Sequence, residues 1–144
     1  MVWSNTLSSN IKKLQLIQNF ASRIITGVSK FDHVTPILRQ LNWLSIKQQL
    51  YLRDAVMTYK CVNNLAPKYL SSNLKQRSAI HSRHTRNRND LAIPLFRTAS
   101  GQRSFAYRSV KIWNDLDNSL KSSPSVVSFK KKLSDCLLGN VTAI

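Results

Sequence analysis

Glutamate is absent from this chain, glycine and proline are scarce, and no long apolar run occurs. Its 144 residues include three glycines and four prolines. So few chain-reversing residues favour a mostly helical fold, and they exclude a glycine-rich phosphate-binding loop. No run reaches the roughly 18 apolar residues that a bilayer-spanning helix needs, so we expect no membrane span. The first ten residues also lack the basic-then-apolar order of a signal peptide, which predicts an intracellular protein, nuclear or cytoplasmic.

Acidic side chains of any kind are few. Six aspartates oppose 22 lysines and arginines, which leaves a formal net charge of +16. Such a charge predicts polyanionic partners; a nucleic acid is favoured, and an anionic membrane surface is the rival. The only closely spaced acids are Asp115 and Asp117, which point in different directions on a helix. We therefore expect them to solvate a helix end, and we predict neither a metal site nor enzymatic activity.

Cysteine is represented by Cys61 and Cys136 alone, each within an apolar helical pattern. Buried free thiols are the favoured interpretation, and a disulfide between them is the alternative. Together with His81 and His84 they supply four possible zinc ligands, but their spacing matches no zinc-binding pattern. We predict no metal and no cofactor.

Helical periodicity organises both ends of the chain into one domain, residues 1–144. Apolar residues at steps of three and four predict a helix from Ser8 to Thr26, ended by Gly27 in a left-handed conformation. Further helices are expected over 36–41, capped by Thr35; from Ser45 to about Val62; and from Pro67 to Leu74. These form an N-terminal helical block, 8–74. A C-terminal helical pair is expected over 101–139, with Ser123-Pro124 starting its last helix.

Between these blocks the apolar pattern stops, and residues 75–100 predict a basic loop followed by an extended segment. Residues 91–95 alternate in character, and Pro94 would confine a strand there to a sheet edge. From Lys68 to Lys111 ten basic residues face one acid, so this stretch carries +9 of the +16. Eight of the ten are the predicted phosphate contacts: Lys75, Arg77, Arg83, Arg86, Arg88, Arg97, Arg103 and Arg108.

Aromatic residues are interleaved with these charges. Phe105 and Trp113 keep the helical period and are expected in the core. Tyr107 is equally compatible with the core and with an exposed position, where it could stack on an unpaired base.

Five segments, in order, carry a family resemblance: LQLIQNFASRIITG (14–27), HVTPILRQLNWLSIKQQL (33–50), TYKCVNNLAPKYL (58–70), GQRSFAYRSVKIWNDL (101–116) and PSVVSFKKKL (124–133). They resemble the region C-terminal to the polymerase core in reverse transcriptases of non-LTR (LINE-type) retrotransposons. The resemblance covers nearly the whole chain. It implies a helical region that helps to hold template RNA and target DNA.

The same resemblance implies that catalysis resides elsewhere. The family's polymerase site contains an Asp-Asp pair in the palm domain, and this chain has no Asp-Asp pair. No endonuclease domain is recognisable either. We therefore expect a truncated, non-catalytic fragment of a retroelement protein, with Met1 as an accident of truncation.

The expected fold is all-α, a bundle of four or five helices with one long basic loop, with or without a short extended segment. The expected function is binding of RNA or single-stranded DNA without sequence preference and without a membrane partner. The alternative is an inactive structural remnant that only packs against a missing thumb domain or the polymerase core of a related full-length protein. An exposed apolar strip on the helix 46–62 would favour that alternative.

Overall fold

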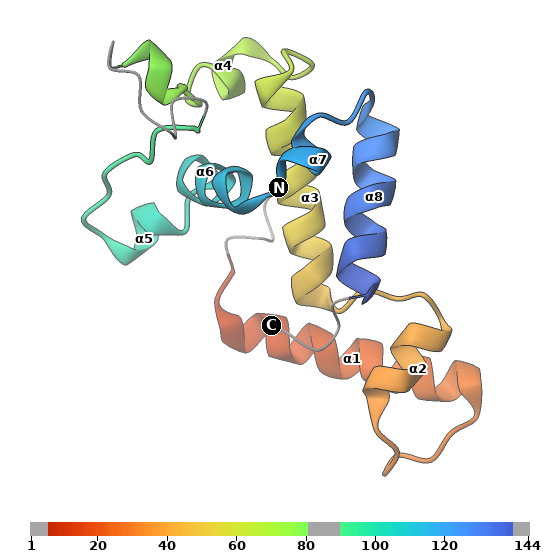
Figure 1. Ribbon diagram of the computed structural model, residues 1–144. Coiled ribbons are helices and arrows are strands. Elements are labelled where there is room, and N and C mark those ends of the chain that lie inside the picture. The colour runs from red at the N-terminus through yellow and green to blue at the C-terminus, as the bar shows by residue number, and fades with distance from the viewer. Residues whose placement is uncertain (1–5, 81–89, 140–144) are drawn as a thin grey trace.

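The structure, a computed structural model, describes residues 6–80 and 90–139, and in these ranges it is helical (Figure 1). The all-α prediction is confirmed, with five helices of seven residues or more. In chain order the elements are α1 (Ser8–Thr26), α2 (Val34–Gln40), α3 (Ile46–Val62), α4 (Lys68–Ser71), the 3₁₀ turn η2 (Arg77–Ala79), α5 (Ala99–Gln102), α6 (Phe105–Asp115), α7 (Asn118–Lys121) and α8 (Val126–Gly139).

Helix α3 is the centre of the fold and packs most extensively against α6 and α8 (Figure 1). Its Tyr59 ring stacks on Phe129 of α8, with ring centroids 4.6 Å apart, and meets Trp113 of α6 at 6.4 Å. The Tyr59 hydroxyl donates to the carbonyl of Ser123 at 2.5 Å, so this buried polar group is satisfied. These three aromatic side chains join α3, α6 and α8 into one core.

Local signals set the ends of α1 and α3 as predicted. Gly27 ends α1 at φ 69°, and its N–H donates to the Arg23 carbonyl at 2.8 Å. Ser45 begins α3 with a capping box, in which its hydroxyl accepts from the Gln48 N–H and the Gln48 side chain accepts from the Ser45 N–H.

Helix α1, by contrast, turns its apolar face away from the core. Leu16, Phe20 and Ile24 are 66%, 66% and 64% exposed, whereas the fully covered residues of α1 are Gln18 and Ser22. The Gln18 side-chain amide donates to the Leu44 carbonyl at 2.8 Å. Polar hydrogen bonds thus seat α1 on the connection between α2 and α3, and its apolar ridge faces solvent.

Two predicted helix starts are wrong in detail. Helix α2 begins at Val34 rather than after Thr35, and its N-cap residue His33 makes no side-chain cap. At α8 the cap is Ser125, whose hydroxyl accepts from the Ser128 N–H at 3.2 Å, rather than Ser123, which is buried. A Ser/Thr-Pro pair predicted a cap at both places, but the surrounding contacts placed the first turn elsewhere.

The C-terminal block holds more than the predicted pair of helices. The periodic run from Phe105 breaks at Leu116, whose ψ of 142° is extended, and α7 follows with Asp117 as its N-cap. Within the described residues no strand forms. Leu91 makes one isolated antiparallel bridge with Gln76.

Both cysteines are free, so no disulfide links them. Cys61 is buried as expected, but Cys136 is exposed because it lies on the outer side of α8. No helix in the described ranges combines the length and the apolar character needed to cross a membrane.

Candidate nucleic-acid interface

Five of the eight predicted phosphate contacts fall in the described part of the chain, and they form two groups and one exception. Lys75 and Arg77 lie beside the Gln76–Leu91 bridge, whereas Arg97 and Arg103 flank α5. Arg108 is the exception. The remaining three, Arg83, Arg86 and Arg88, lie outside the described residues.

The first group, Lys75 and Arg77, lies on a short backbone ladder. The Arg77 N–H donates to the Asp90 carbonyl at 2.9 Å, and the Ala92 N–H donates to the Lys75 carbonyl at 2.8 Å. Lys75 is exposed and Arg77 is half-buried. These hydrogen bonds hold the backbone of both cations in place. Because they join backbone atoms only, the Lys75 and Arg77 side chains take no part in them.

Asn114 attaches this ladder to the core. Its side-chain amide accepts from the Leu91 N–H at 2.9 Å and donates to the Leu91 carbonyl at 3.0 Å. Asn114 thereby replaces a neighbouring strand, and it buries the Leu91 side chain against the helices. Sequence reasoning missed Asn114, since a single asparagine in a helix carries no signal for a partner 23 residues away.

The second group, Arg97 and Arg103, is exposed on either side of the one-turn helix α5. Thr98 caps α5 by accepting from the Gly101 N–H at 3.1 Å, and Ser104 caps α6 by accepting from the Tyr107 N–H at 3.4 Å. These two caps fold the chain into a tight corner before α6. We call it the α5–α6 corner: Phe96, Arg97, Arg103, Tyr107 and Lys111.

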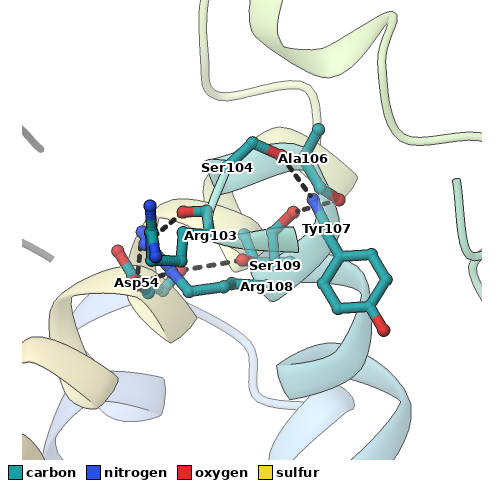
Figure 2. Close-up of polar contacts among 8 residues, drawn as sticks. Asp54, Arg103, Ser104, Ala106, Tyr107, Arg108 and Ser109 are labelled. Atoms are coloured by element: carbon teal, nitrogen blue, oxygen red, sulfur yellow. Dashed lines mark hydrogen bonds and ion pairs between the residues drawn. The ribbon is translucent and has the colours of Figure 1, made fainter. Parts of the chain in front are cut away.

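Arg108 has a structural role instead of the predicted surface one. Its Nε and Nη2 atoms each lie 3.1 Å from one carboxylate oxygen of Asp54, and Nη1 donates to the Arg103 carbonyl at 2.6 Å (Figure 2). Asp54 is 3% exposed on α3, so its charge is neutralised inside the protein. Sequence reasoning missed this pair because 54 residues separate the partners. Arg108 is therefore removed from the proposed phosphate contacts.

An aromatic pair lies on the outer side of the α5–α6 corner. The rings of Phe96 and Tyr107 meet edge to face with centroids 6.4 Å apart, and the Lys111 ammonium lies 5.7 Å from the centre of the Tyr107 ring. Neither ring belongs to the buried core, which contains Trp113 as predicted. Phe105, also predicted for the core, is only half-buried.

The metal sites weighed from the sequence can be compared with the described residues. These residues contain no group of three or more histidine, cysteine or acidic side chains able to hold a metal ion. His81 and His84, weighed as zinc ligands, lie outside the described ranges. Asp117 caps α7, and hydrogen bonds from the Ser119 hydroxyl and the Asn118 N–H lower its carboxyl pKa. This confirms the helix-end role predicted for Asp117.

No protein-family model matches the chain, and no curated protein and no solved structure matches it.

Proposed function

We propose that this chain is a non-catalytic module that binds RNA or single-stranded DNA through phosphates, as the C-terminal region of a non-LTR retrotransposon reverse transcriptase would. The observation that carries the proposal is the unneutralised positive charge. A net charge of +16 is borne by 144 residues, and within residues 6–80 and 90–139 one ion pair is present, Arg108 with Asp54. Exposed cations held without acidic partners are those that release counterions when phosphates replace solvent anions.

The arrangement of the described contacts supports the same proposal. Lys75 and Arg77 lie beside Leu91, which is hydrogen-bonded to Asn114 near the C-terminal end of α6. Arg97 and Arg103 flank α5, which comes directly before the N-terminal end of α6. Lys111 lies on α6 between them and is exposed. Exposed cations therefore lie near both ends of α6 and on the helix itself.

The catalytic part of the parent activity is not proposed for this chain. The family that it resembles polymerises DNA with an aspartate pair that this sequence lacks. We propose that the chain retains the nucleic-acid-holding role of that region alone.

The test is fluorescence anisotropy with a labelled 20-nucleotide single strand, titrated with NaCl. We expect the logarithm of the association constant to fall linearly with the logarithm of salt concentration, by about 0.7 per phosphate neutralised. Lys75→Gln with Arg97→Gln and Arg103→Gln should lower the slope by about 2. Arg83→Gln with Arg86→Gln and Arg88→Gln should do the same.

A matched control removes the same charge elsewhere. Lys130, Lys131 and Lys132 are exposed on α8, and changing all three to Gln lowers the net charge equally. We expect this variant to keep most of the slope. A flat salt response of the unaltered protein, or equal losses in all three triple variants, would refute the proposed interface.

A second candidate function is packing against another protein, and the exposed face of α1 favours it. An exposed apolar strip on α3 would have favoured this candidate, but within the described residues no large apolar side chain of α3 is exposed. Leu16, Ile17, Phe20 and Ile24 on α1 are each about two-thirds exposed instead. Such a continuous apolar face is typical of interaction surfaces. A remnant that only packs against the polymerase core of a related full-length protein would need a face of this kind.

Sedimentation equilibrium tests this candidate. If α1 is a packing face, the isolated chain should associate as its concentration rises, and Leu16→Ser with Phe20→Ser should abolish association without lowering the melting temperature. Val127, 78% exposed on α8, offers the control Val127→Ser. A chain that stays monomeric at high concentration and salt would argue against it.

A further inference from the structure

The α5–α6 corner places two aromatic rings at the surface within a cluster of cations. We infer that Tyr107, supported by Phe96, is a stacking platform for one unpaired base, and that Arg97, Arg103 and Lys111 hold the adjoining phosphates. This inference rests on the proposed nucleic-acid binding and specifies its ligand as a single strand. It names the ring that contacts the base, which the charge pattern alone does not.

The position of the rings is the first observation. Phe96 is 37% exposed and Tyr107 is half-buried, so neither is needed to fill the core, and the core helices already have Tyr59, Trp113 and Phe129. The edge-to-face contact between Phe96 and Tyr107 fixes the angle of the Tyr107 ring at 66° to its neighbour. In Figure 2 the ring points away from the Asp54–Arg108 pair.

The rigidity of the corner is the second observation. Phe96 packs so closely on Gly101 that a Cβ there would lie 2.9 Å from three Phe96 side-chain carbons. The Gln102 amide donates to the Phe96 carbonyl at 3.3 Å. The Ser104 cap holds the backbone of Tyr107. The rings are therefore positioned before any ligand arrives, which lowers the entropy cost of stacking.

The buried ion pair is the third observation, because it anchors the corner to the core. Arg108 bridges the Asp54 carboxylate of α3 and the Arg103 carbonyl at the end of α5 (Figure 2). The Arg103 backbone is thus held in place by Arg108, with the Arg103 side chain left exposed. Arg108 is a positioning residue for the platform and does not itself contact the ligand.

These features match a nucleotide with an accessible base face. A base stacks on an aromatic ring, and its phosphates accept hydrogen bonds from guanidinium or ammonium groups nearby. The Lys111 ammonium lies over one face of the Tyr107 ring, within the reach of a cation–π contact, so the proposed base stacks on the other face. Paired bases in a duplex keep their faces stacked on each other and cannot use the platform. The corner therefore favours single strands over duplexes.

The experiment uses the full chain and two probes, a 12-nucleotide single strand containing 2-aminopurine and the matching duplex. We expect 2-aminopurine fluorescence to be quenched on binding of the single strand. Tyr107→Leu should weaken single-strand binding roughly tenfold, the loss of one stacked base, while leaving the salt slope and the duplex affinity unchanged. Tyr107→Phe keeps the ring and should bind like the unaltered protein.

Tyr69 supplies the matched control, since it is 71% exposed on α4 and belongs to no described ring pair. Tyr69→Leu should leave both affinities unchanged. Unquenched 2-aminopurine, or equal losses of single-strand and duplex affinity in Tyr107→Leu, would overturn the platform while salt-dependent binding still upheld the proposed function. If no probe bound with a salt-dependent affinity, the proposed function itself would fail.

The exposed side chain of Leu95 points to a competing ligand for the α5–α6 corner, an apolar protein surface. Leu95 is 99% exposed next to Phe96, so an apolar protein partner is the other ligand that this corner could take. Leu95→Ser separates the two. Unchanged 2-aminopurine quenching in that variant supports the base, and its loss overturns the platform.

Discussion

At the scale of single residues, the Asp54–Arg108 pair is the most consequential contact that the fold makes. Asp54 has a 4% exposed side chain and Arg108 a 20% exposed one. Removing one member leaves the other charge desolvated without its partner, which costs more than the intact pair contributes. The pair also gives Arg108, within the basic stretch, a structural role.

Arg108→Met should lower the free energy of unfolding by about 3 kcal/mol, because the Asp54 charge stays buried. Urea unfolding followed by circular dichroism measures it. Arg103→Met is the control; its exposed side chain should cost less than about 0.5 kcal/mol. Adding Asp54→Leu to Arg108→Met should restore part of the loss. Equal stabilities for the two arginine variants would contradict the structural role of Arg108.

The two cysteines should differ sharply in reactivity. Burial raises the pKa of the Cys61 thiol, so less reactive thiolate forms at a given pH, whereas Cys136 is exposed on α8. With a thiol reagent at pH 8 we expect one fast and one slow reaction, and two fast ones in urea. Cys136→Ser should remove the fast phase. A fast phase that survived this substitution would show that Cys61 is accessible.

At the scale of elements, the capping box at Ser45 determines where the central helix starts. Ser45 and Gln48 satisfy each other's backbone N–H groups at the point where α3 meets α1 and α8. Gln48 also reaches α8, donating to the Leu137 carbonyl at 3.1 Å. Gln48 therefore takes part both in the local cap of α3 and in a contact between α3 and α8.

Ser45→Ala should therefore destabilise the protein by about 1 kcal/mol, the usual effect of losing an N-cap. Thermal unfolding monitored at 222 nm measures the change. Ser45→Thr keeps an acceptor oxygen and should retain most of the stability. If alanine and threonine behaved alike at this position, the hydroxyl would have no capping role.

At the scale of the whole molecule, uncompensated charge sets stability as well as binding. The 16 excess positive charges on these 144 residues repel one another, and salt screens that repulsion. Raising NaCl from 20 to 300 mM should raise the melting temperature by a few degrees, on the order of 3 °C. Scanning calorimetry measures the shift. KCl at equal ionic strength should act alike, and a melting temperature that fell with salt would contradict this expectation.

Short-range sequence patterns account for the local features of this protein. The all-α class, the bounds of α1, the left-handed end at Gly27 and the cap at Ser45 were predicted because neighbours three or four residues apart encode them. The concentration of ten of the 22 basic residues between Lys68 and Lys111 was equally legible, since it depends only on residue order.

Long-range contacts, by contrast, determine which partners the side chains on these helices have. The Gln18 side chain bonds the Leu44 carbonyl and Arg108 pairs with Asp54, while the apolar ridge of α1 lies at the surface. The hydrogen bonds between the Asn114 side chain and the Leu91 backbone are a third such contact. Each of these contacts joins residues more than 20 positions apart, and no local period or cap encodes a partner at that separation.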